Sequence, residues 1–322
     1  MPFLRPLSLL LFALSLHAAA FDLQAHRGGR GLLPENTLPA FENALALGVD
    51  TLELDIGVTA DGVVVISHDP YLNPLIVRDA GGQFLPGVKG PLIKSLTLAQ
   101  LQSYQLGQIQ PGSPYATTFA TQQPRDGIHI PTLVSLFDRA KALGANDVRF
   151  NIETKLDPGR PDETVSPDAM TRALLRVVND AGMASRVTIQ SFDWRSLQLV
   201  QHLEPRIPTV YLTIQTANTD NVRDGTWTAG FRIADHGSVP KLVKAAGGAA
   251  WSPNGGAVTE ALVKEAQALG LKVVPWTINA PADLERMLGW GVDGLITDYP
   301  DRLREAMHKR GMALPKPVVT AG

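Results

Sequence analysis

Three carboxylates stand where their spacing could bring them together. Glu53 and Asp55 lie two residues apart in an apolar run, and Glu153 and Lys155 repeat that spacing in a later run. Side chains two apart on a strand project from the same face, and carboxylates crowded in a shielded place repel unless a cation lies between them. We therefore expect Glu53, Asp55 and Glu153 to bind a divalent cation. Because the chain has no cysteine, Mg²⁺ or Ca²⁺ is favoured over zinc. The alternative is a solvated strand edge.

Two histidines, His26 and His68, each end an apolar run. An imidazole can take up and release a proton near neutral pH, so both are candidates for acid/base catalysis. Arg27 and Lys155 add positive charge beside the carboxylates, a grouping suited to a phosphate group. Trp276 ends a later run and is either a core residue or an apolar wall for a small substrate.

These residues need a fold that brings strand ends together. Short apolar runs alternate with amphipathic stretches, the pattern of repeated strand and helix units. Thr37 or Asn36 can cap one helix and Thr259 starts another, and Gly48 and Gly270 are typical helix ends. Nine strands are predicted, at residues 21–25, 51–56, 63–66, 148–152, 186–189, 209–212, 249–251, 272–276 and 294–296.

The third run follows the second across a short turn containing Ala60-Asp61-Gly62, which leaves no room for a helix. Eight strand–helix units plus one extra strand near residues 63–68 predict a (β/α)₈ TIM barrel, an α/β fold whose active site lies at the carboxyl ends of its strands. An open doubly wound sheet is the alternative, but no GxGxxG follows the first strand.

Residues 70–130 interrupt the pattern. The stretch is rich in Gly, Pro and Gln, with one helical segment near residues 97–104. A loop of that length usually has a function or forms a small subdomain, so we expect an insertion over the barrel mouth. The barrel should span residues 21–310, and residues 311–322 should be a flexible tail.

The first twenty residues are typical of a secretory signal peptide. Arg5 precedes an apolar stretch at residues 7–16, and Ala18-Ala19-Ala20 offers a cleavage site before Phe21. The stretch is too short to span a bilayer, so we expect a periplasmic or secreted protein without stable membrane insertion. Lys and Arg total 29 against 31 Asp and Glu, a balance that argues against nucleic-acid partners.

Short motifs in a fixed order resemble the glycerophosphodiester phosphodiesterase family, in particular its exported bacterial members. The resemblance covers roughly residues 24–305. The motifs are His26-Arg27-Gly28, Pro34-Glu35-Asn36-Thr37, Glu53-x-Asp55, Thr59-x-Asp61-Gly62, His68-Asp69, Glu153-x-Lys155, Gln190-Ser191-Phe192, Trp276-Thr277 and Thr297-Asp298.

The resemblance implies a metal-dependent TIM-barrel enzyme that hydrolyses glycerophosphodiesters to sn-glycerol 3-phosphate and an alcohol. It implies that a Ca²⁺ or Mg²⁺ ion is the cofactor, with His26 and His68 as the acid/base pair. The implied metal ligands are Glu53, Asp55 and Glu153, and the implied substrate contacts are Arg27, Lys155, Gln190 and Trp276.

Other functions remain open on the sequence. A phospholipase D-type enzyme acting on lysolipids or sphingolipids would need an apolar or membrane-facing surface, and no amphipathic basic helix is visible. A non-catalytic periplasmic binder of phosphorylated small molecules would not need two histidines. A glycoside hydrolase using two carboxylates would leave the histidines and Lys155 unexplained.

Overall fold

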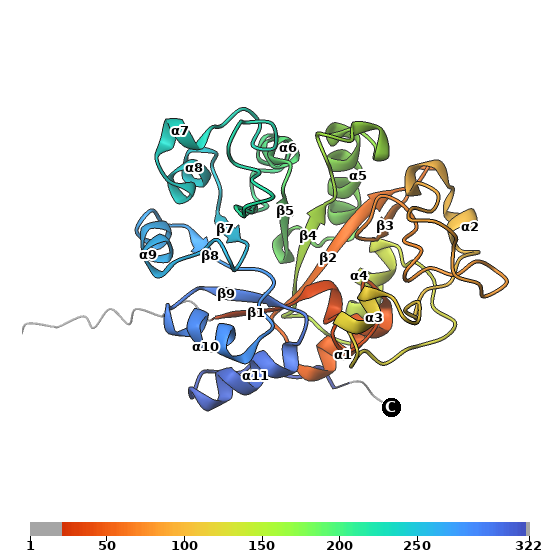
Figure 1. Ribbon diagram of the computed structural model, residues 1–322. Helices are drawn as coiled ribbons and strands as arrows, with labels where there is room; N and C mark the ends of the chain where they lie inside the picture. Colours follow the sequence, from red (N-terminus) through yellow and green to blue (C-terminus); the bar gives the residue numbers. More distant parts are fainter. Residues whose placement is uncertain (1–20, 320–322) are drawn as a thin grey trace, which may run out of the picture.

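The computed structural model describes residues 21–319 (Figure 1). The predicted signal peptide, residues 1–20, and residues 320–322 lie outside the described part of the chain. The strands are β1 (Asp22–Ala25), β2 (Thr51–Val58), β3 (Val64–Ile66), β4 (Arg149–Thr154), β5 (Val187–Ser191), β6 (Thr209–Thr213), β7 (Ala250–Pro253), β8 (Lys272–Val273) and β9 (Gly294–Thr297).

Within residues 21–319, eight parallel strands form a nearly closed barrel in the order β8-β7-β6-β5-β4-β2-β1-β9. Backbone hydrogen bonds between β9 and the segment that follows β8 complete the ring. The Ile278 N–H donates to the Ile296 carbonyl, and the Ile296 N–H donates to the Pro275 carbonyl, each at 3.0 Å. The extra strand, β3, pairs antiparallel with β2. The predicted (β/α)₈ barrel with an extra strand is thus confirmed.

Helices surround the strands on the outside of the barrel (Figure 1). Their starts follow local capping chemistry: the Thr37 hydroxyl accepts from the Ala40 N–H at 3.3 Å, and Thr259 caps Leu262 in the same way. The helices are α1 (Leu38–Leu47), α2 (Leu98–Leu101), α3 (Pro114–Thr118), α4 (Leu133–Ala142), α5 (Pro167–Asp180), α6 (Trp194–Leu203), α7 (Ile233–His236), α8 (Val239–Ala245), α9 (Glu260–Ala268), α10 (Pro281–Gly289) and α11 (Pro300–Lys309).

The main core lies between the barrel strands and the helices. On β2, Leu52, Leu54 and Ile56 are completely buried in this apolar cluster. Because side chains alternate along a strand, the intervening Glu53 and Asp55 point into the barrel instead. Burying one such aliphatic side chain is worth about 1.5–3 kcal/mol, so this alternation fixes which face of β2 meets the helices.

The insertion after β3 has an apolar cluster of its own. Eight buried residues form it: Val65, Leu72, Val77, Ile93, Leu101, Leu106, Ile128 and Ile130. The helix expected at residues 97–104 is only the single turn α2, which begins with a capping box between Thr97 and Gln100. A second part of the insertion contacts the loop after β1, where the Gln122 amide donates to the Arg30 carbonyl at 2.7 Å.

The segment after α11 is packed, in contrast to the flexible end expected from its sequence. The Val318 N–H donates to the Leu45 carbonyl at 2.9 Å, and the Arg304 guanidinium donates to the Pro315 carbonyl at 2.9 Å. Leu314 and Val318 also pack against the main core, and this apolar contact holds the segment against α1 and α11.

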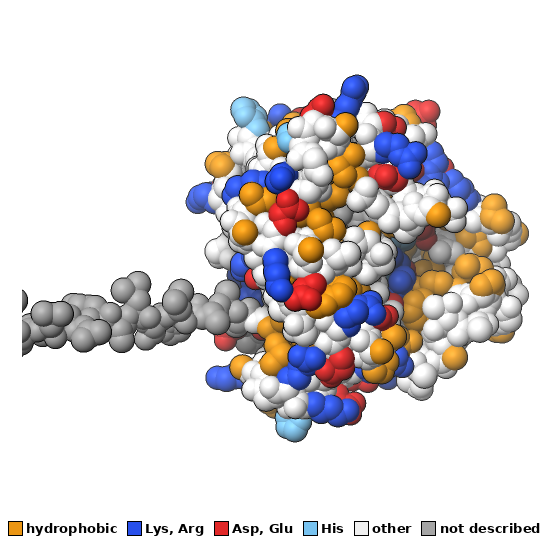
Figure 2. All heavy atoms as spheres, turned by 60° about the vertical axis from the view of Figure 1, so that its left-hand side comes forward, with side chains coloured by type: hydrophobic (Ala, Val, Ile, Leu, Met, Phe, Trp, Pro, Cys, Tyr) orange, Lys and Arg blue, Asp and Glu red, His pale blue; other side chains and the backbone are white. Residues whose placement is uncertain are grey.

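Charged side chains of both signs are interspersed over the face shown in Figure 2, with no large area of one sign. This distribution agrees with the formal net charge of -2. None of the helices between residues 21 and 319 combines the length and the apolar character needed to cross a bilayer.

Candidate active site

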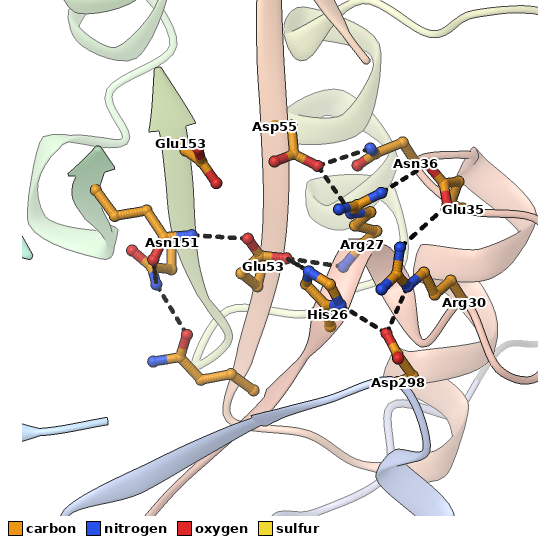
Figure 3. A network of polar contacts seen from close by, with 12 residues as sticks. His26, Arg27, Arg30, Glu35, Asn36, Glu53, Asp55, Asn151, Glu153 and Asp298 are labelled. Atoms are coloured by element: carbon orange, nitrogen blue, oxygen red, sulfur yellow. Dashed lines mark hydrogen bonds and ion pairs between the residues drawn. The ribbon is translucent and has the colours of Figure 1, made fainter. Parts of the chain in front are cut away.

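Three acidic side chains converge at the barrel mouth, as their spacing predicted. Glu53 and Asp55 come from β2 and Glu153 from the neighbouring β4, where Asp55 and Glu153 are paired in register. Each residue offers a carboxylate oxygen, and these oxygens all lie within 4.8 Å of one another (Figure 3). All three side chains are buried, so their mutual repulsion is only weakly screened.

The pKa values of the three carboxyl groups reflect their burial and their closeness to one another. Burial, with the nearby negative charge of Asp55, raises the pKa of Glu53 well above its ordinary value. Burial also raises the pKa of Glu153 to about 7. Burial acts on Asp55 in the same direction, but the positive charges of Arg27, His68 and Lys155 together lower its pKa. The positive side chains nearby therefore do not fully compensate the negative charge of three ionised carboxylates.

A divalent cation fits this cluster. Within residues 21–319, Asp55 Oδ1 is fully buried and has no hydrogen-bond partner. Its nearest cation is Lys155 Nζ, 3.7 Å away, and Lys155 bonds more closely to Glu153 Oε1 at 2.8 Å. An orphaned carboxylate oxygen among oxygen-only ligands is the donor chemistry that Mg²⁺ and Ca²⁺ prefer.

The turn after β1 aims two further residues at the cluster. Arg27 adopts a left-handed backbone conformation, with φ of +50°, which a non-glycine residue rarely holds without support. Its N–H donates to Glu53 Oε2 at 2.8 Å and stabilises the turn. Gly28 follows with φ of +81°, and a Cβ there would lie 3.0 Å from Ala40 Cβ and from Phe41. Glycine thus lets the turn pack closely against α1.

His26 is held in one orientation by Asp298, at the end of β9. The two side chains meet at 2.6 Å between Nδ1 and Oδ1. A carboxylate can only accept, so Nδ1 carries the proton and Nε2 is left toward Glu53 Oε2, 3.9 Å away. Burial outweighs the attraction of Asp298 and lowers the pKa of His26 to about 4. The imidazole is therefore neutral at physiological pH.

His68, at the end of the extra strand, lies on the other side of the site and is more exposed. Its Nδ1 is 3.1 Å from Asp69 Oδ1. Burial and the positive charges of Arg27 and Lys155 lower its pKa. Both predicted histidines therefore lie beside the carboxylates, each with a further carboxylate behind its Nδ1 (Figure 3 shows His26).

A buried ion-pair chain connects Arg27 to the insertion. Arg27 Nη1 donates to Glu35 Oε1 at 2.9 Å, and Arg27 Nε lies 3.3 Å from Asp55 Oδ2. The other Glu35 oxygen accepts a hydrogen bond from the Tyr115 hydroxyl of α3. Arg30 Nε donates to Asp298 Oδ1 at 2.7 Å, and the Arg30 guanidinium stacks on Phe119. The insertion thereby helps to orient both arginines.

Two residues expected at the substrate have different surroundings. Gln190 is bonded within the protein, because one amide N–H donates to Glu53 Oε1 at 2.7 Å and its carbonyl accepts from Asn151 at 2.8 Å. It therefore positions Glu53, and it also lines the cavity where the substrate contact was predicted. Trp276 is half-buried, packs edge-on against Phe192, and lines the cavity.

One cavity of about 90 Å³ lies at the barrel mouth, and its lining includes His26, Arg27, Arg30, Glu53, His68, Glu153, Lys155, Gln190 and Trp276. The sequence did not single out Asp298, Glu35 or Tyr115 as functional residues, although Asp298 ends a strand and Glu35 lies in a motif. Tyr115 carries no local signal at all, because its partner lies 80 residues away.

The fold and these side chains define a (β/α)₈-barrel hydrolase of phosphate esters. Residues 26–302 match the model of the Glycerophosphoryl diester phosphodiesterase family, and the chain belongs to this family. It is accordingly a phosphoric diester hydrolase.

Individual proteins agree with this assignment. A glycerophosphodiester phosphodiesterase of Caldanaerobacter subterraneus subsp. tengcongensis is 29% identical over 89% of this chain and 98% of its own length. A crystal structure from Silicibacter pomeroyi DSS-3, assigned as a glycerophosphoryl diester phosphodiesterase, is 34% identical, with a TM-score of 0.82 over 92% of this chain and 96% of that one. An Oleispira antarctica phosphodiesterase, solved with the product sn-glycerol-3-phosphate, shares the fold at 22% identity and a TM-score of 0.64, over 89% of this chain and 96% of that one.

Proposed function

We propose that this enzyme hydrolyses glycerophosphodiesters to sn-glycerol 3-phosphate and an alcohol, with Glu53, Asp55 and Glu153 holding a Ca²⁺ or Mg²⁺ ion. The observation that carries the proposal is the cluster of the three buried carboxylates at one point of the barrel mouth. The adjoining cavity is lined by two of these carboxylates, by both histidines and by the cations Arg27, Arg30 and Lys155. The product bound to the Oleispira antarctica relative supports the substrate class.

The cation, when bound, supplies a Lewis acid that polarises the phosphoryl oxygens. Arg27 and Lys155 add fixed positive charge for the same phosphate, already oriented by Glu35 and Glu153. Trp276 offers an apolar face in the lining of the cavity, against which the carbon chain of glycerol would lie.

His26 and His68 serve as the proton-transfer pair. One imidazole takes the proton of the glycerol 2-hydroxyl as its oxygen attacks phosphorus, and the other gives a proton to the departing alkoxide. The substrate hydroxyl is already close to phosphorus, so its attack benefits from a high effective concentration and forms a 1,2-cyclic phosphate. Water then opens the ring, with the two imidazoles exchanging roles.

Three assays test this function. Purified protein is incubated with glycerophosphodiesters, with and without EDTA, and glycerol 3-phosphate is measured; release that survives chelation contradicts the role of the metal. A substrate with hydrogen in place of the 2-hydroxyl should be almost inert, and hydrolysis near the parent rate contradicts cyclisation. Lysophosphatidylcholine is included because preferred turnover of this lipid would instead support the phospholipase D-type alternative.

The cellular location belongs to the same proposal. The basic residue, apolar stretch and Ala-rich site in residues 1–20 support export, cleavage after Ala20, and a periplasmic or secreted enzyme. Mass spectrometry of the exported protein checks this, and an intact Met1 contradicts it.

A further inference from the structure

A second cavity adjoins the catalytic cavity at the barrel mouth. Its volume is about 170 Å³, against about 90 Å³ for the catalytic cavity. The two cavities share four lining residues, His68, Glu153, Lys155 and Phe192. A phosphodiester bound at this shared wall could extend one ester arm into each cavity. We call the larger cavity the outer chamber.

The chemistry of the two cavities differs beyond the shared wall. Besides the titratable groups already described, which are His26, Arg27, Arg30 and Glu53, the catalytic cavity is lined by the uncharged residues Gln190, Leu212, Trp276, Thr277 and Ile296. This environment suits glycerol, which carries hydroxyls and no charge. The outer chamber continues instead into Asp69, Pro70, Leu156, Asp157, Arg160, Glu163, Thr164 and Trp227. The leaving alcohol of the diester would occupy this charged chamber.

Negative charge predominates in the outer chamber. Among the described residues that line it alone, three are carboxylates, and Arg160 is the one cation. Arg160 Nε bonds to Asp157 Oδ2 at 2.7 Å and Arg160 Nη1 lies 3.4 Å from Glu163 Oε2, but its side chain is 55% exposed. Ion pairs to so exposed a cation are weak and screened, so they only partly cancel the acids. Lys89 also contacts Glu163, outside the set of lining residues.

The acidic groups are fixed more firmly than the cation is. Asp157 Oδ1 accepts from the Gly159 N–H at 2.8 Å, and Asp69 Oδ2 accepts from the Asn73 amide at 2.8 Å. Both acid side chains are less than a quarter exposed. Preorganised carboxylates of this kind favour a cationic ligand group without having to be reoriented.

Aromatic rings complete the chamber. Phe192 is held edge-on against Trp276 with ring centroids 5.3 Å apart, and Lys155 Nζ lies 6.0 Å from the Phe192 centroid. Trp227, half-buried in the loop after β6, also lines the chamber. Aromatic faces attract ammonium groups, above all quaternary ones, by about 0.5–2 kcal/mol.

We infer that the outer chamber is a head-group subsite that selects glycerophosphodiesters whose leaving alcohol carries a quaternary ammonium group. The inference rests on the proposed function, because it places the phosphate at the shared wall. It adds a residue set that does not touch the reacting atoms: Trp227 and Asp157 favour the cation, and Arg160 opposes it.

The test compares two substrates of the same shape. One is sn-glycero-3-phosphocholine, and the other is its carbon isostere, in which 3,3-dimethylbutanol replaces choline. We expect the wild-type enzyme to favour the choline ester in kcat/KM by about tenfold, the factor expected of one good ammonium contact. Because the readout is a ratio, a general loss of activity in a variant cancels.

The variants should move this ratio in opposite directions. Trp227→Leu and Asp157→Asn should each lower it about three- to tenfold, whereas Arg160→Gln should raise it. Trp290→Leu and Asp168→Asn are the matched controls, since Trp290 lies at the end of α10 and Asp168 pairs with Arg172 on α5. Both controls should keep the wild-type ratio.

The outcomes separate the two proposals. If the wild-type enzyme cleaves both esters at the same kcat/KM, or if the three chamber variants leave the ratio unchanged, the subsite is overturned and the proposed function stands. If neither ester nor any other glycerophosphodiester is cleaved, the proposed function is wrong and the subsite falls with it.

Discussion

Replacing Asp298 by asparagine isolates what the carboxylate behind His26 contributes. The substitution keeps the size of the side chain and removes its charge. Asp298 Oδ1 meets His26 Nδ1 at 2.6 Å and Arg30 Nε at 2.7 Å, and Oδ2 accepts from the Asn279 amide at 2.7 Å. All three partners are donors, so an amide, with only one oxygen, cannot satisfy them in either orientation.

Asn279 cannot relieve the conflict by turning over. Its oxygen accepts from the Asp298 N–H at 2.9 Å and from the Thr297 hydroxyl at 3.2 Å, and both bonds would be lost. At least one hydrogen bond to the His26 imidazole or to Asn279 therefore fails. A hydrogen bond to a charged group is worth about 1.5–3 kcal/mol, so misorientation of His26 should lower kcat/KM by roughly 10- to 150-fold.

The assay measures kcat/KM against pH for the wild type, Asp298→Asn and a control, Asp293→Asn. Asp293 also accepts two hydrogen bonds, from the Val273 N–H at 2.9 Å and from Gln267 at 3.1 Å, but outside the active site. Because Asp298 raises the pKa of His26 against the effect of burial, its removal should also move the acidic inflection to lower pH. Both bonds of Asp293 go to its Oδ2, so the single oxygen of asparagine can keep them, and the control should keep the wild-type thermal stability and pH profile.

The reasoning is refuted if Asp298→Asn keeps kcat/KM within about threefold of the wild type and the same acidic inflection. It is also refuted if both variants lose activity in parallel with their thermal stability. In that case Asp298 would serve the fold and would not orient His26.

Three further predictions follow from the same geometry. The pKa of Glu53 is raised and that of Glu153 is raised to about 7, so binding of Mg²⁺ or Ca²⁺ near neutral pH should release protons. Calorimetry in buffers of different ionisation enthalpy measures this release. Glu53→Gln should abolish activity while keeping the fold. His26 takes up a proton near pH 6.5 in the unfolded chain but only near pH 4 in the folded chain. The free energy of unfolding should therefore fall by up to about 3 kcal/mol as the pH drops through that window. Urea unfolding measures this fall, which should be smaller in His26→Gln. Tyr115→Phe should lower kcat/KM by about 5- to 30-fold, because Glu35 loses a hydrogen bond that helps to orient Arg27. The control Tyr104→Phe, also within the insertion, should leave kcat/KM unchanged. Equal effects of the two substitutions would contradict the role of Tyr115 in orienting Arg27 through Glu35.

Much of the barrel could be predicted because its signals are local. The alternation of Leu52, Leu54 and Ile56 with Glu53 and Asp55 shows which side chains face the helices, since the face of a strand residue depends only on its position in the strand. Helix starts such as that at Thr37 depend on a hydrogen bond spanning three residues. The packing of the segment after α11 could not be predicted, because the chain there forms no helix or strand and its contacts are with α1, far away in the sequence.

The sequence by itself determined the residue types of the site and the strand ends that carry them: three carboxylates, two histidines and two cations. Only the tertiary structure decided how these groups are used. His26 and Asp298 are 272 residues apart, and closure of the barrel brings them together. Gln190 lies at a strand end like the other site residues, and its amide bonds to both Glu53 and Asn151. Such pairings are not encoded in local spacing, because a hydrogen bond depends on where separate strands and the insertion meet in three dimensions.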